Sequence, residues 1–234
     1  MLDLPAHIPL VFILTTLATY IIFIFAMLNS KDERVKKRAN FIAVVMLLWL
    51  IFQSTLSLNK WYMDRTSVPP HLAFPLITSI VVIVLLFILK RGKKLLDGLS
   101  LETLTWLHTV RIPVELCLLW LAMHKQVPFS MTFEGYNFDI AFGLTAPIMA
   151  ILYFRKKKIS RSILLGWNVL ALISVVAVVI RAIGAVPSPI QAWDFAQPNY
   201  AVLHFPFIWL PAFVVPAVVL AHLVAFRQLR RKTV

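Results

Sequence analysis

Three ionisable side chains lie inside one long apolar run, where each needs a physical reason. The run covers residues 101–125, LETLTWLHTVRIPVELCLLWLAMHK, and contains His108, Arg111 and Glu115. At about 100° per residue, His108 and Glu115 lie almost on one line along a helix, and Arg111 lies about 60° to one side. An ionisable group in a membrane helix costs a few kcal/mol on insertion scales, about 2.5–3.5 at the centre, so this stripe predicts a buried polar site.

Two interpretations of the stripe remain open. Arg111 and Glu115 are spaced i, i+4, so they could neutralise each other within one helix and fix helix packing. Alternatively, one or both contact a substrate, an ion or a proton in a central cavity, with His108 nearer the cytoplasmic end. The polar or aromatic candidates for partners in such a cavity are Gln53, Ser54, Ser57, Trp106 and Asn168.

Composition predicts an all-α polytopic membrane protein. Hydrophobic residues make up 60% of the 234 residues and charged residues 14%, and the mean hydropathy is +0.85. Such values are typical of membrane proteins and exclude an ordinary soluble domain. We expect a single seven-helix membrane domain over residues 1–234, with spans near 8–28, 40–58, 71–89, 102–124, 138–154, 162–184 and 202–226.

The basic residues predict the topology. Of the 23 Lys and Arg residues, 18 lie in or beside the first, third and fifth loops and the carboxyl-terminal end, at positions 31–38, 90–94, 155–161 and 227–232. By the positive-inside rule, the amino terminus is outside and the carboxyl terminus is cytoplasmic. Anionic lipid headgroups account for these basic loops, so the net charge of +13 does not indicate nucleic-acid binding.

A second polar group is expected at the outer mouth of the bundle, and it comprises Glu134, Asn137, Asp139, Arg181 and His204. Arg181 is predicted to pair with an outer acid and tie the outer loops over the bundle, or else to clamp an anion. No fixed ligand spacing indicates a metal, no cofactor is expected, and the single cysteine cannot form an internal disulfide.

Three stretches carry a resemblance to a family: RIPVE at 111–115, FEGYNFDIAFGLTAP at 133–147 and FPFIWLP at 205–211. With these patterns the chain resembles a group of uncharacterised bacterial seven-helix integral membrane proteins. The resemblance implies a bacterial source and a family that covers the whole chain, and for a polytopic bacterial protein with basic cytoplasmic loops we expect a location in the inner membrane. It implies no activity.

The stripe and the topology together predict an integral membrane protein with a polar intramembrane pocket. The pocket, lined by His108, Arg111 and Glu115, is expected to bind or transport a small or amphipathic molecule. One alternative is an intramembrane enzyme that acts on a lipid or isoprenoid, with Glu115 or His108 as acid or base. Another is a structural partner of a larger membrane complex. Membrane lipids are the expected partners in each case.

Overall fold

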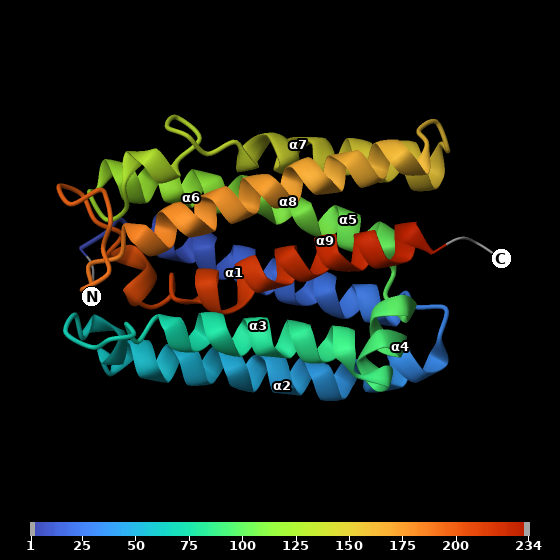
Figure 1. Ribbon diagram of the computed structural model, residues 1–234, viewed down its shortest axis with the longest axis horizontal. Helices are drawn as coiled ribbons and strands as arrows, with labels where there is room; N and C mark the ends of the chain where they lie inside the picture. The colour runs from blue at the N-terminus through green and yellow to red at the C-terminus, as the bar shows by residue number, and fades with distance from the viewer. Residues whose placement is uncertain (1–2, 232–234) are drawn as a thin grey trace.

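The long helices run roughly along one axis in the computed structural model, which describes residues 3–231 (Figure 1). No β-strand occurs among these residues. Five helical segments are long and apolar enough to cross a membrane, and the all-α class predicted from composition is confirmed. They are α1 (His7–Leu28), α2 (Glu33–Leu58), the segment Leu101–Met123, α8 (Arg161–Gly184) and the segment Leu210–Arg230.

Several of these segments are interrupted. Leu101–Met123 contains α5, a 3-10 turn and α6, and Leu210–Arg230 begins with a π turn. The bounds of the shorter elements are α3 Ala73–Ile88, α4 Lys90–Gly98, α5 Leu101–Leu107, η2 His108–Val110, α6 Arg111–Met123, α7 Asp139–Ala150, η4 Ile151–Arg155, η6 Leu210–Val214 and α9 Val215–Arg230.

Two helical segments are too short to cross a membrane as single straight helices. The 12 residues of α7 continue into the five-residue π turn Ile151–Arg155, which is a short path for a bilayer. Helix α3 bends by 92° into α4, and only the two helices together are long enough to cross a membrane. The last helical segment starts at Leu210, later than the predicted residue 202. Residues 201–203 form a separate 3-10 turn, and the extended backbone of His204 ends that turn before the helix begins.

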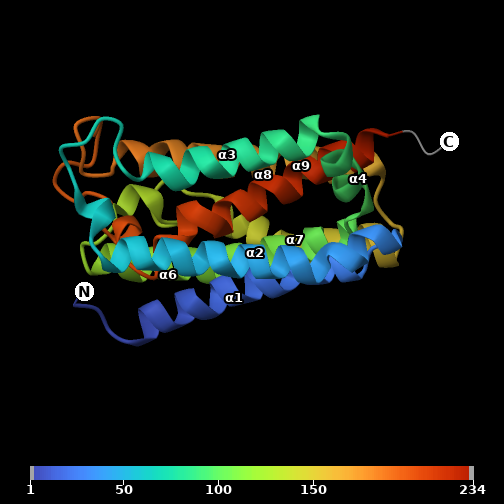
Figure 2. The ribbon, with the colours of Figure 1, turned by 90° about the horizontal axis from the view of Figure 1, so that it is seen from below.

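The basic segments gather at one end of the bundle. The α1–α2 loop, α4, the connection from η4 to α8 and the end of α9 all lie at the end where the carboxyl terminus is drawn (Figure 1). The amino terminus lies at the other end. Figure 2 shows the same alignment from below, with α4 folded across the basic end.

The centre of the bundle is formed by the interrupted segments. In both Leu101–Met123 and Leu210–Arg230, 56% of the most apolar stretch is buried, against 17% in α2. Helix α2 is therefore peripheral, with exposed side chains such as Phe41 and Leu48. The central position of Leu101–Met123 buries the polar stripe that this segment carries.

A proline in α9 leaves a backbone carbonyl free to bond side chains of α2 and α3. Pro216 lacks the N–H that would otherwise bond the carbonyl of Ala212. That carbonyl accepts a hydrogen bond from Trp49 Nε1 in α2 at 2.9 Å and one from Ser79 Oγ in α3 at 3.5 Å. The backbone oxygen beside the proline thus joins three helices.

Candidate functional site

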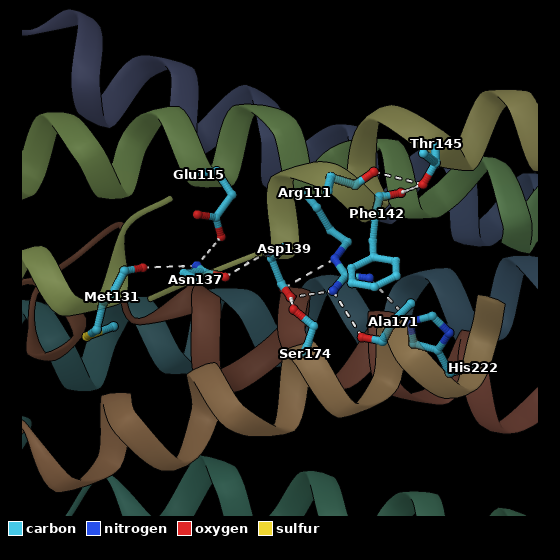
Figure 3. Close-up of polar contacts among 11 residues, drawn as sticks. Arg111, Glu115, Met131, Asn137, Asp139, Phe142, Thr145, Ala171, Ser174 and His222 are labelled. Atoms are coloured by element: carbon cyan, nitrogen blue, oxygen red, sulfur yellow. Dashed lines mark hydrogen bonds and ion pairs between the residues drawn. The ribbon is translucent and has the colours of Figure 1, made fainter. Parts of the chain in front are cut away.

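Eight polar side chains form one connected group inside the bundle, which we call the polar network. Figure 3 shows its part around Arg111, Asp139 and Asn137. They come from η2, α6, α7 and its approach, α8 and α9. Seven of the eight are at most 8% exposed, and the serine is half-buried. The polar network comprises His108, Arg111, Glu115, Asn137, Asp139, Asn168, Ser174 and His222.

The centre of the polar network is an ion pair between Arg111 and Asp139. The guanidinium Nη2 lies 2.5 Å from one carboxylate oxygen and Nε lies 3.2 Å from the other, so the pairing is bidentate. Nη2 also donates to the Ala171 carbonyl at 3.1 Å. The hydroxyl of Ser174 donates to the same carboxylate. Arg111 therefore pairs with an acid on a different helix, and its i+4 neighbour Glu115 is not its direct partner.

Glu115 lies beside this pair, and an asparagine connects them. Asn137 Nδ2 donates to Glu115 Oε1 at 2.6 Å and to the Met131 carbonyl at 2.9 Å, while Asn137 Oδ1 accepts from the Asp139 backbone N–H at 2.9 Å. Every hydrogen-bonding group of the Asn137 amide is thus used. Glu115 Oε2 is buried and has no hydrogen-bond partner among the described residues.

Two stacked histidines lie on the other side of the ion pair. The rings of His108 and His222 are 3.9 Å apart and within 18° of parallel. His222 Nδ1 lies 2.8 Å from Asn168 Oδ1, and because Asn168 Nδ2 donates to the Leu164 carbonyl, that oxygen is an acceptor. His222 Nδ1 is therefore the donor. Its Nε2 lies 3.5 Å from Arg111 Nη1 and is left to accept.

Local backbone features bring these side chains together. Asn137 precedes α7 and bonds the backbone two residues on, a turn that Asn favours, and so places Asp139 at the start of the helix. One turn later, a Cβ on Gly143 would lie 2.9 Å from Ile112 Cγ1 and 3.3 Å from Arg111 Cβ. The glycine permits α7 to approach α6 closely enough for Asp139 to reach Arg111.

The predicted outer-mouth group does not form one cluster. Asn137 and Asp139 belong to the polar network, whereas Glu134 is exposed on a turn. Arg181 Nη1 donates to the Ser130 carbonyl at 3.0 Å, and the guanidinium lies 4.9 Å from the centre of the Tyr136 ring. The predicted pairing of Arg181 with an acid is therefore replaced by a carbonyl and an aromatic ring, which connect α8 to the segment between α6 and α7.

His204 is separate from both groups. Its Nδ1 lies 3.0 Å from the Tyr200 carbonyl, at the rim of a mainly apolar hollow that also contacts Lys60. In the part of the chain that the structure describes, no three His, Cys, Asp or Glu side chains lie close enough to hold a metal ion.

Sequence reasoning missed His222 and Ser174. His222 lies within the last apolar run, residues 202–226. The rule that identified His108, an ionisable residue inside a span, applies equally to His222. Ser174 carries no such signal, because serine is common in membrane helices.

One family model matches the part of the chain that contains this whole site. Residues 68–230 match the family model described as Domain of unknown function (DUF8737). The chain belongs to this family. The DUF8737 region starts before α3 and ends at the last residue of α9, so it contains the complete polar network and leaves out α1 and α2. No curated protein and no solved structure matches the chain significantly.

Proposed function

We propose that the chain is a seven-span protein of the bacterial inner membrane, with its amino terminus outside and its carboxyl terminus in the cytoplasm. The support comes from five apolar helices of membrane length, the bent α3–α4 pair and α7 with its π turn. Opposite placement of the termini fits an odd number of crossings (Figure 1). The basic residues at one end select the orientation.

Within this protein, we propose that the polar network binds a proton or a small cation at Glu115 during the binding or movement of a small or amphipathic molecule. The observation that carries the proposal is Glu115 Oε2, a buried carboxylate oxygen without a partner among the described residues. A buried acceptor of this kind costs free energy unless something bonds to it.

The charges of the polar network favour a cation at that position. Arg111 and Asp139 neutralise each other in a bidentate pair, so the charge of Glu115 has no cation of its own. A net charge in the membrane interior is costly, and a proton or monovalent cation at Glu115 would make the group neutral. A proton bound to Glu115 Oε2 needs no cavity.

The geometry also supplies ionisable groups on both sides of the ion pair. Glu115 lies on the side of Met131, and His222 of α9 lies on the other side of the ion pair (Figure 3). His108 stacks on His222 at a ring distance of 3.9 Å. His108 Nδ1 is buried and, within the described residues, has no hydrogen-bond partner. Chains of carboxylates and histidines of this kind mark proton pathways in membrane proteins.

The test compares two glutamates in the purified full-length protein. Infrared spectra of wild type, Glu115→Gln and Glu134→Gln are recorded over a pH series, and proton uptake is followed in proteoliposomes with an entrapped pH-sensitive dye under an imposed membrane potential. Glu134→Gln is the matched control because Glu134 is exposed.

The proposal expects a titrating carboxylic-acid band and proton uptake in wild type and in the control. The part of the band that belongs to Glu115 and the proton uptake should both be absent from Glu115→Gln, with an unchanged circular dichroism spectrum. If Glu115→Gln retains the infrared band and the uptake of wild type, Glu115 is not the binding group and the proposal is wrong. The polar network would then serve helix packing, through the Arg111–Asp139 ion pair that joins α6 to α7.

A further inference from the structure

We infer that the basic end of α9, together with the end of α3, binds one anionic glycerophospholipid. This inference rests on the proposed membrane placement and is independent of proton binding at Glu115. The site is a hollow of about 460 Å³ that opens at the surface, which we call the α3–α9 hollow. It is lined by Phe87, Leu223, Phe226, Arg227, Arg230 and Arg231.

The order of the lining residues along α9 matches the order of groups in a phospholipid. Leu223, Phe226, Arg227 and Arg230 follow the i, i+3, i+4, i+7 spacing of one helix face. The apolar pair comes first, on the side of the membrane interior, and the arginines follow at the end of the helix. An acyl chain would therefore contact the apolar part while the phosphate reaches the guanidinium groups.

The charge in the α3–α9 hollow is positive. Asp97 accepts from Arg227 Nε at 2.7 Å and Nη2 at 2.8 Å, and it pairs with Arg231 Nη1 at 2.5 Å. One carboxylate thus orients two guanidinium groups, and Arg230 adds a third cation. None of the six lining residues is acidic. Guanidinium groups bind phosphate in bidentate geometry, so an anionic phosphate is the complementary group.

The bend between α3 and α4 leaves this space open. Helix α4 turns by 92° relative to α3 directly after Phe87 and Ile88. The close turn depends on Gly92, where a Cβ would lie 2.4 Å from the Leu86 carbonyl oxygen. Helix α4 contacts α9 through Asp97, and beside this contact Phe87, in the last turn of α3, lines the hollow opposite α9. Basic pockets between helices at the cytoplasmic side are sites of this type for acidic lipid headgroups.

Binding of phosphatidylglycerol and of phosphatidylcholine with the same acyl chains is measured by native mass spectrometry of the full chain in a neutral detergent. The variant Arg230→Gln/Arg231→Gln removes two cations from the hollow and leaves the Arg227–Asp97 contact in place. The control Lys156→Gln/Lys158→Gln removes two exposed charges at the same end of the bundle. Inorganic phosphate is added as a competitor in a separate titration.

We expect wild type and the control to bind one phosphatidylglycerol in preference to phosphatidylcholine. Each arginine near an anionic headgroup contributes about 1 kcal/mol, which is slightly more than fivefold in affinity. The Arg230/Arg231 variant should therefore lose about 30-fold in phosphatidylglycerol affinity, with phosphatidylcholine binding unchanged. Equal losses in the control would show diffuse charge attraction, and no loss in the variant would exclude the arginines. Displacement by inorganic phosphate would show an anion site without a lipid requirement. Each of these three results overturns the inference.

Discussion

The assignment of Arg111 to Asp139 can be tested with two double-mutant cycles that share the arginine. The first cycle combines Arg111→Met with Asp139→Asn, and the second combines Arg111→Met with Glu115→Gln. Helix spacing within the segment favours the second pair, whereas the structure places the direct contact in the first. The two cycles therefore separate an intrahelical pairing from an interhelical one.

The expected magnitude follows from burial and geometry. Arg111 is 3% exposed and Asp139 is 8% exposed, and two guanidinium nitrogens contact the carboxylate at 2.5 and 3.2 Å. Removal of one partner from a buried pair leaves an unpaired charge and costs about 3–5 kcal/mol. Removal of both charges avoids that cost, so the double variant should be more stable than the sum of the single losses by about 1.5–3 kcal/mol.

Reversible unfolding in mixed detergent and SDS micelles, followed by circular dichroism, supplies the free energies of unfolding. The Arg111–Asp139 coupling should clearly exceed the Arg111–Glu115 coupling. Additive losses in the first cycle, or a larger coupling in the second, would refute the interhelical pairing. Glu134→Gln combined with Arg111→Met is a control cycle for which we expect additivity, since Glu134 is exposed on a turn.

Two further predictions concern packing and pH. Gly143→Ala should destabilise the protein by about 1–3 kcal/mol, because the added Cβ overpacks against α6. Gly166→Ala is the control: nothing lies within 4 Å of its added Cβ, so it should be neutral or stabilising by about 0.5–1 kcal/mol. Equal effects of the two substitutions on the free energy of unfolding would contradict the close approach of α7 to α6. Burial raises the pKa of Asp97, but the hydrogen bonds and charges of Arg227 and Arg231 outweigh it and hold this pKa below the usual 3.8. The stabilisation from this ionised carboxylate is therefore present above pH 3.8 and is lost as the pH falls through the lowered pKa, so the stability difference between wild type and Asp97→Asn should shrink on acidification.

Local patterns in the sequence were sufficient for the helical class and for the main polar stripe. Hydropathy depends on the composition of a run, and the turn angle of a helix determines which residues share a face. His108, Arg111 and Glu115 could therefore be identified as a buried stripe, and all three are at most 3% exposed. The same local rule applied to the last run would have added His222.

The contacts between helices were decided by the tertiary structure. The spacing of Arg111 and Glu115 permits a pair within one helix, but α7 approaches α6 closely at Gly143, and Asp139 is therefore the acid that contacts the guanidinium. His108 meets His222 only because the segment Leu101–Met123 packs beside α9. Helix periodicity is a property of neighbouring residues, so the sequence by itself determined which side chains face inward. Their partners depend on how distant helices pack, and this packing is the sum of many long-range contacts that no single run of residues encodes.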